Sequence, residues 1–368
     1  MSSLRHPALL ALVLAACGVP PTPSPHVTGA SWVSADPLFH REPRWLGADA
    51  AYSIDLGGDR SLWLFGDTFV ATSPALARSA SKMVHNTVAV QTGRDPLTAQ
   101  IAFRWGTGAD GAPASFFAED GALYHWPGHG VRLGDGGPLV VFLSVVKSTP
   151  GQGLGFAGAG YRAVLVDHPD DDPATWAPRL LEPAPPPFDA VVGGMVVREA
   201  GFVIALATRS AGTHEGYLAR VREADLLAGR LAPEWWTGDG GWIAQAALKG
   251  KPAVVLDDAG AECSIHFEAR TKRWVHVASR GFGATTLAVR VAPALTGPWS
   301  APVDAFLPPE SSGTSPFVYA AKAHPELSTS GGGLVVTYAT NSFDFGTLFK
   351  PRGAALYWPR FAVLTFER

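Results

Sequence analysis

The sequence predicts an all-β protein, built as a five-bladed β-propeller. The 368 residues include 41 glycines and 31 prolines, which interrupt the chain too often for long helices. Short β-branched and aromatic runs between turn signals dominate instead. Only residues 223–229 indicate one or two helical turns. The third observation is a single kind of β-hairpin that recurs five times along the chain.

The recurring hairpins are recognised by their second strands, which begin at residues 62, 139, 202, 274 and 334. An upstream strand is expected before each of them, at 52–56, 130–133, 194–197, 264–268 and just before 331. A third strand follows most of them, at 86–90, 161–166, 217–221 and 286–291. Five units of about four strands are typical of a propeller, whereas the alternative, a pair of β-sandwiches, gives no reason for five similar hairpins. The last strand, 360–366, is expected to complete a blade with residues near Trp32 and so leave no free sheet edge.

The N-terminus reads as a targeting segment. Arg5 and His6 precede an apolar run that ends in Leu14-Ala-Ala-Cys17-Gly, which resembles a bacterial lipobox. The resemblance implies a signal peptide at 1–16 and a lipid on the thiol of Cys17. A Pro-rich tether at 17–27 and one propeller domain at 28–368 are expected to follow. The protein is then expected on the bacterial cell envelope, anchored in the membrane through Cys17 and facing the periplasm or the exterior. The alternative is an ordinary secretory signal with a chance cysteine.

Charge and cysteine content exclude several function classes. The chain has 29 basic and 32 acidic residues and no basic run, so nucleic acid is not an expected partner. With Cys17 lipidated, Cys263 would be the only thiol left, and no intrachain disulfide could form. His125 and His129 have the spacing of a helical metal pair, but Pro127 between them forbids that helix. The acidic segment 167–173 lacks the Gly and Glu of a calcium loop. No metal or cofactor is expected.

The most informative segment for chemistry is the apolar strand 62–65, which stops at Gly66 and Asp67. Asp49 stands at the start of the preceding strand, and a hairpin through residues 57–60 would bring the two aspartates to one spot. A pair of carboxyl groups is the minimum that acid/base catalysis of glycosidic-bond cleavage requires. Glu262 is the alternative acid. The competing interpretation is that Asp67 accepts bonds from turn amides and Asp49 caps a loop.

Further polar residues fall where the strands of the five units would open onto one mouth of the ring. A mixture of acids, bases and amides there fits a sugar site better than a site for an apolar ligand. The residues expected to bind substrate are His85, Asn86, Trp126, His129, Arg209, Arg280, His324 and Asn341. For each of them, a structural hydrogen bond at a turn or blade edge is the alternative.

Several motifs together resemble a known family. They are Gly-Ala-Asp49, Trp-Leu-Phe-Gly-Asp67-Thr, His85-Asn-Thr, Trp126-Pro-Gly-His129, Glu262-Cys-Ser, Gly297-Pro-Trp-Ser, Lys322-Ala-His-Pro-Glu and Tyr357-Trp-Pro-Arg-Phe. They look like a bacterial family of five-bladed propellers formerly of unknown function, which is similar to the glycoside hydrolase group containing endo-D-arabinanases. The resemblance implies that Asp49 and Asp67 are the catalytic pair. The chain reads Gly-Ala-Asp where Gly-Thr-Asp is expected, and its Lys322 block suggests a sister branch.

The sequence therefore predicts a surface-anchored glycoside hydrolase of furanosidase or endo-arabinanase type, with a polysaccharide or glycan as substrate. The main alternative is a propeller lipoprotein that binds glycans without cleaving them. A structural or protein-binding propeller is the third possibility.

Overall fold

The computed structural model describes residues 21–151, 155–186, 188–209, 212–281, 285–312 and 316–367. The described chain is built almost entirely from antiparallel β-strands, as the sequence predicts, with one α-helix of five residues, α1 (Glu223–Leu227). The strands form five sheets of four or five strands, here called sheets I to V, and two smaller sheets. The predicted signal peptide, residues 1–16, and the predicted lipidation site, Cys17, lie outside the described residues.

Sheets I to V follow one another along the chain. Sheet I contains β3 (Tyr52–Gly57), β4 (Arg60–Phe65), β7 (Thr87–Thr92) and β8 (Gln100–Arg104). Sheet II contains β11 (Leu123–Arg132), β12 (Leu139–Ser148), β13 (Phe156–Val166) and β14 (Arg179–Leu181). Sheet III contains β15 (Val191–Glu199), β16 (Phe202–Thr208), β17 (Gly216–Arg222), β18 (Glu234–Trp236) and β19 (Trp242–Ala244).

Sheet IV contains β20 (Cys263–Glu268), β21 (Arg273–Arg280), β22 (Thr286–Ala292) and β23 (Val303–Phe306). Sheet V contains β24 (Pro316–Ala323), β25 (Leu334–Ser342), β26 (Arg360–Phe366) and, at its outer edge, β1 (Val27–Ser31). The smaller sheets are β2 (Trp45–Ala48) with β5 (Thr68–Ala71) and β6 (Ser81–Val84), and β9 (Gly106–Thr107) with β10 (Pro113–Ala114).

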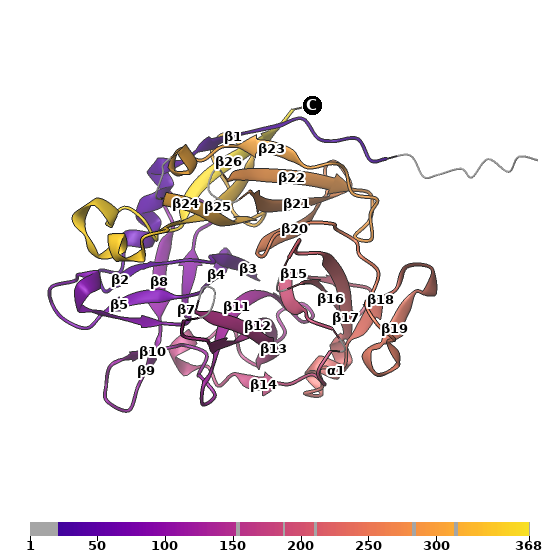
Figure 1. Cartoon of the computed structure of the whole chain (residues 1–368), viewed down its shortest axis with the longest axis horizontal. Coiled ribbons are helices and arrows are strands. Elements are labelled where there is room, and N and C mark those ends of the chain that lie inside the picture. Colours follow the sequence, from indigo (N-terminus) through magenta and orange to yellow (C-terminus); the bar gives the residue numbers. More distant parts are fainter. Residues whose placement is uncertain are drawn as a thin grey trace, which may run out of the picture.

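The five larger sheets are arranged around a common centre (Figure 1). Their first strands lie innermost: β11 packs against β3 and β15, and β20 packs against β15 and β24. Ser53 on β3 shares a 2.6 Å hydrogen bond with His324, just after β24, and this contact closes the ring. The all-β propeller prediction is confirmed. The five predicted hairpins are the first hairpins of sheets I to V, whereas the sequence did not indicate the two smaller sheets.

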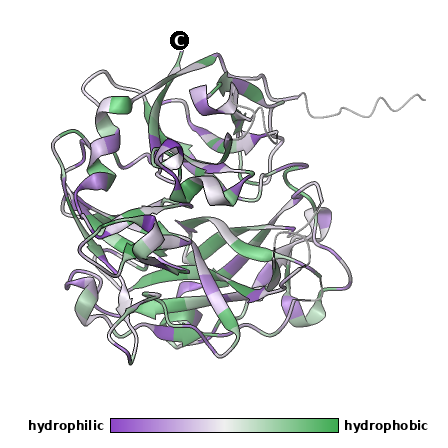
Figure 2. Ribbon diagram, turned by 60° about the vertical axis from the view of Figure 1, so that its left-hand side comes forward, coloured by the Kyte–Doolittle hydropathy of each residue, from purple (hydrophilic) through white to green (hydrophobic). Residues whose placement is uncertain are grey.

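The apolar strands of the sequence pack against each other between the sheets. Five clusters of buried side chains fill the spaces between neighbouring larger sheets. The space between sheets V and I holds the largest aromatic group, in which Phe39 stacks on Phe361 and lies edge-on to Trp63. Figure 2 shows hydrophobic residues concentrated along the strands and polar ones on the connecting loops. Burial on this scale is the main force that holds the sheets together, because the backbone ladders run within each sheet and only single hydrogen bonds, such as that of Ser53 with His324, join neighbouring sheets.

The chain ends meet in sheet V. Residues of β1 pair with β26 from Val27↔Phe366 to Ser31↔Ala362, and the Trp32 amide then donates to the Phe361 carbonyl at 2.8 Å. The last strand therefore completes a sheet with the start of the domain. The end of the predicted tether also contacts the domain, because the Thr22 hydroxyl donates to the Pro298 carbonyl at 2.6 Å. In the described part of the chain, no helix is long and apolar enough to cross a membrane.

Candidate active site

Asp49 and Asp67 are brought together where the smaller β2–β5–β6 sheet meets sheet I. Asp49 stands between β2 and β3, and Asp67 stands between β4 and β5. The Gly66 amide donates to the Asp49 carbonyl at 3.2 Å, which ties the two segments directly. A Cβ atom built on Gly66 would lie 2.5 Å from Asp49 Oδ1. The glycine before Asp67 therefore leaves the space that the other carboxylate needs.

The carboxyl group of Asp49 is surrounded by aromatic hydroxyls and other acids. Its Oδ2 accepts hydrogen bonds from the hydroxyls of Tyr319, at 2.8 Å, and Tyr357, at 3.3 Å. Burial raises the pKa of Asp49 to about 8, and the negative charges of Asp67 and Glu262 add to the effect. The Tyr319 hydrogen bond and the positive charge of Lys322 act in the opposite direction. Burial and the neighbouring negative charges therefore favour the protonated form of Asp49.

Asp67 has a different environment, made by sheet II. Its Oδ1 accepts a hydrogen bond from Trp126 Nε1 at 2.8 Å and lies 2.9 Å from His85 Nδ1. The His85 ring stacks on Tyr124, with ring centres 3.8 Å apart. About a fifth of the Asp67 side chain is exposed to solvent (20 %). One oxygen of Asp67 is therefore in contact with an indole N–H and an imidazole nitrogen.

Glu262 reaches the same site from sheet IV. It stands just before β20, and its Oε2 lies 2.7 Å from the Nζ of Lys322, a β24 residue whose side chain is 1 % exposed. The Glu262 side chain is 28 % exposed, so solvent reaches it. The charge of Glu262 is close enough to act on Asp49. Three carboxyl groups, those of Asp49, Asp67 and Glu262, therefore lie near one another, from two sheets.

Three of the residues expected to bind substrate make hydrogen bonds within the protein, and two of them, Asn86 and His324, are completely buried. Asn86 accepts from the Phe117 amide and donates to the carbonyls of Phe117 and His125. Its side chain has zero exposure and fastens a loop to sheet I, which is a structural role.

His129 and His324 lie near the axis of the ring. The Val196 amide donates to His129 Nδ1 at 3.0 Å, so Nε2 carries the proton and donates to the Ser53 carbonyl. Burial lowers the pKa of His129 to about 4, which keeps this imidazole neutral. His324 is fully buried between the hydroxyls of Ser53 and Thr337. Both histidines join sheets; His324 has no exposed surface with which to contact a substrate, whereas His129 is partly exposed.

Of the remaining predicted residues, Arg280 and Arg209 are exposed at the surface and Asn341 belongs to the site. Arg280 is exposed and pairs with Asp304 of the same sheet at 3.1 Å. Arg209 is exposed at the turn after β16, where its backbone amide donates to the Glu215 carbonyl and its own carbonyl lies 3.1 Å from His214 Nδ1. Asn341, near the end of β25, bonds the hydroxyl of Tyr319 and so supports the hydrogen bond that Tyr319 makes to Asp49.

Four residues of the site were not predicted as such: Tyr124, Tyr319, Lys322 and Tyr357. Tyr357 and Lys322 stand inside motifs that the sequence analysis singled out without giving either residue a role. The signal for Lys322 was its charge in an otherwise apolar strand, since a lysine is almost never buried without partners. Tyr319 gave no such signal, because an aromatic residue in a strand is ordinary core composition.

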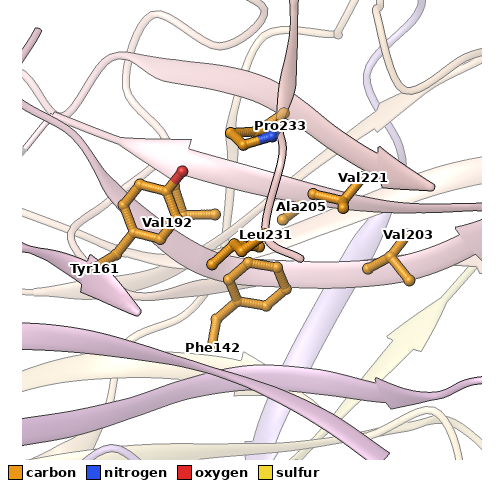
Figure 3. A pocket seen from close by; sticks show the side chains of 9 residues that line it. Phe142, Tyr161, Val192, Val203, Ala205, Val221, Leu231 and Pro233 are labelled. Carbon is orange, nitrogen blue, oxygen red and sulfur yellow. The ribbon is translucent and has the colours of Figure 1, made fainter. Parts of the chain in front are cut away.

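Two hollows in the molecule lie away from the carboxyl groups. The first, between sheets II and III, is lined by Phe142, Leu231 and other apolar side chains and by the ring of Tyr161 (Figure 3). It leaves no room for a water molecule and is a packing gap of the core. The second lies on sheets IV and V beside Glu268 and Gly331–Gly333, at the far ends of the strands. Among the residues in the described ranges, no group of three or more His, Cys, Asp or Glu side chains could hold a metal ion.

The fold is shared with solved structures. A candidate hydrolase from Bacteroides ovatus superposes with a TM-score of 0.71 at 16% identity, over 92% of this chain and 90% of that chain. The catalytic domain of the GH62 α-L-arabinofuranosidase of Coprinopsis cinerea superposes with a TM-score of 0.51 at 12% identity, over 93% of this chain and 97% of that chain. No curated protein sequence matches this chain. Residues 34–365 match the model of a family described as a domain of unknown function (DUF5005), and the protein therefore belongs to the DUF5005 family.

Proposed function

We propose that the protein is a glycoside hydrolase in which Asp49 is the general acid and Asp67 is the nucleophile or base. One observation carries the proposal: two neighbouring aspartates have opposite environments. Asp49 is surrounded by tyrosines and acids that keep its proton on, whereas Asp67 accepts N–H bonds and is open to solvent. A protonated and an ionised carboxyl group in one site are what cleavage of a glycosidic bond requires.

In the proposed reaction, Asp49 gives its proton to the glycosidic oxygen as the bond to the sugar carbon breaks. Asp67 either attacks that carbon or takes a proton from the water that does so; in both cases one water molecule is consumed per bond. Glu262, held by Lys322, is the alternative acid. If Asp67 is the nucleophile, the released sugar retains its anomeric configuration, and if Asp67 is the base, the configuration is inverted. Proton NMR of the freshly released sugar distinguishes the two.

Aromatic rings on both flanks of the carboxyl groups support a sugar substrate. Trp126 lies edge-on to Phe156 at 4.6 Å on the sheet II side, and Phe156 is partly exposed. On the sheet V side, Phe317 lies 5.4 Å from Tyr319 and 4.6 Å from the exposed Phe343. Sugar rings present apolar faces that stack on such side chains. The GH62 protein that shares this fold is an α-L-arabinofuranosidase, which makes furanosides such as arabinans the first substrates to test. The lipid anchor at Cys17 is part of the proposal and rests on residues 1–17 alone.

The test is release of reducing ends from arabinans, galactans and related glycans by the wild type and three variants. Asp67→Asn should lose more than about a thousandfold in kcat, because it removes the group that reacts with carbon or water. Asp49→Asn should lose activity on natural glycans but keep much more of it on aryl glycosides, whose leaving groups need no proton. Asp55→Asn, at the other end of β3, is the matched control and should behave as wild type. Full activity in Asp67→Asn would refute the proposal, and binding without turnover in the wild type would favour the non-catalytic alternative.

A further inference from the structure

Lys322 is the one lysine among the described residues whose side chain is almost completely buried. It lies on β24 at an irregularity, where the pairing with β25 shifts register between Tyr319 and Lys322. Its Nζ donates to the carbonyls of Ala50, at 2.7 Å, and Ala320, at 2.8 Å, and lies 2.7 Å from Glu262 Oε2. The ammonium also sits 4.3 Å from the centre of the Tyr52 ring. All N–H groups of the ammonium are therefore used by contacts within the protein.

The two carbonyl groups that Lys322 binds belong to the residues directly after Asp49 and Tyr319. Both of these residues, Ala50 and Ala320, have left-handed backbone conformations, with φ of 64° and 58°. Such conformations cost a non-glycine residue free energy and persist only where the surroundings hold them. One ammonium group thus holds the two strained peptides that set the positions of Asp49 and of its hydrogen-bond donor Tyr319.

We propose that Lys322 is the positioning residue of this site: a single buried cation that fixes Asp49, Tyr319 and Glu262 relative to one another. It does not contact the substrate. This inference rests on the proposed function only where activity is measured, because the titration of Asp49 can be followed without any substrate.

The charge of Lys322 also enters the titration of Asp49. The titratable groups that face this pair are Asp67 from sheet I, Glu262 and Cys263 from sheet IV, Tyr319 and His324 from sheet V, Tyr52 on β3 and Tyr357 before β26. Among them Lys322 supplies the cation that lowers the pKa of Asp49. Removing that cation should therefore raise the pKa at which Asp49 loses its proton.

The first test is Lys322→Met, which keeps the length of the side chain and removes its charge. The alkaline limb of the pH–rate profile should move upward by roughly one pH unit. At the same time kcat should fall at least about tenfold, while KM changes much less. Carboxyl-carbon NMR of aspartate-labelled protein follows the same titration without any substrate, with Asp49→Asn identifying the resonance. A folded variant with unchanged kcat and an unchanged Asp49 titration would overturn the proposal.

A second variant covers the case in which Lys322→Met does not fold because Glu262 is left unpaired. Lys322→Met/Glu262→Gln removes both charges and is compared with Glu262→Gln alone. A positioning role predicts that the double variant has at least about tenfold lower kcat than the single one. Equal kcat would mean that Lys322 serves only as the counterion of Glu262 and would also overturn the proposal.

The control is Arg132→Met, because Arg132 is likewise a mostly buried cation that binds a backbone carbonyl, that of Leu56, and a carboxylate, that of Asp170. It belongs to β11 and bonds Leu56, at the end of β3 that is remote from Asp49. Its loss should lower stability and leave the Asp49 titration in place. If the wild type cleaves no glycan, the proposed function fails, while the NMR titration still decides whether Lys322 controls Asp49.

Discussion

Asp49 and Asp67 show how neighbouring residues of one chemical type acquire different states. Each accepts two hydrogen bonds, but the donors differ: tyrosine hydroxyls for Asp49, and an indole and an imidazole for Asp67. Burial and the surrounding negative charge raise the pKa of Asp49 to about 8. Sequence reasoning placed both aspartates together but did not assign their states, because the tyrosines come from residues some 270 to 308 positions away.

The raised pKa of Asp49 predicts a pH-dependent stability gain in Asp49→Asn. The folded protein binds the Asp49 proton more tightly than the unfolded chain, whose aspartates titrate near 3.8. The stability contributed by this proton is therefore complete below about pH 4 and is lost as the pH rises through about 8. The asparagine side chain of the variant cannot ionise, so the variant should gain on the wild type by up to about 1.4 kcal/mol per pH unit across this window.

The measurement is urea unfolding of both proteins at intervals from pH 4 to 9. The difference in unfolding free energy should grow to the order of a few kcal/mol and level off above pH 8. Asp55→Asn, which changes an exposed carboxylate on β3, the strand that follows Asp49, serves as the reference. A difference that stays constant over the whole range would show that Asp49 is not protonated in the folded protein.

At the scale of elements, the hairpins could be predicted and the irregularities within them could not. Short apolar runs that follow glycine-rich or charged turns are local signals, so β4, β12, β16, β21 and β25 were found from the sequence. The register shifts in β11, β15 and β24 depend on neighbouring sheets. In β11, for example, a Cβ on Gly128 would lie 2.6 Å from the carbonyl of Gly193 on β15. The spacing of apolar residues along the sequence carries no information about this close approach between two strands.

The junction of β4 and β5 gives the prediction that belongs to this scale. Gly66→Ala would place a methyl group 2.5 Å from Asp49 Oδ1, so the carboxyl group has to move. Since Gly66 is not in a left-handed conformation, alanine adds no backbone strain there. We expect kcat to fall more than about tenfold while the melting temperature changes by only a few degrees, because a displacement of about 1 Å at a reacting group is costly.

Gly194→Ala is the matched control on the inner strand β15, where the new Cβ would meet Cys263 Sγ at 3.5 Å, an ordinary contact. It should keep near-normal kcat. If Gly66→Ala is as active as Gly194→Ala, the position of the Asp49 carboxyl group is not critical for turnover.

For the whole molecule, the sequence predicted the ring and the place of its site but not the function of each polar residue around the axis. Asn86, His129 and His324 have the composition of a sugar site, yet their partners come from other sheets and use them for assembly. The role of a buried polar residue can be assigned only once its hydrogen-bond partners are known, because every buried polar group needs a partner, whether in the protein or in a ligand. The closure of sheet V, in contrast, followed from a simple rule, since a last strand without a partner would leave an open edge.

That closure leads to a prediction for shortened chains. A chain that begins at Thr22 keeps β1, the contact to Pro298 and the burial of Val27 beside β26. A chain that begins at Trp32 loses all five β1 residues and exposes the edge of β26. Its melting temperature should be lower by on the order of 5–10 °C, and it should associate through the open edge in a concentration-dependent way. Calorimetry and light scattering compare the two chains directly. Identical melting and a monomeric state for both would mean that β1 lies on sheet V without stabilising it, and that the ring is held closed by the apolar packing between sheets V and I alone.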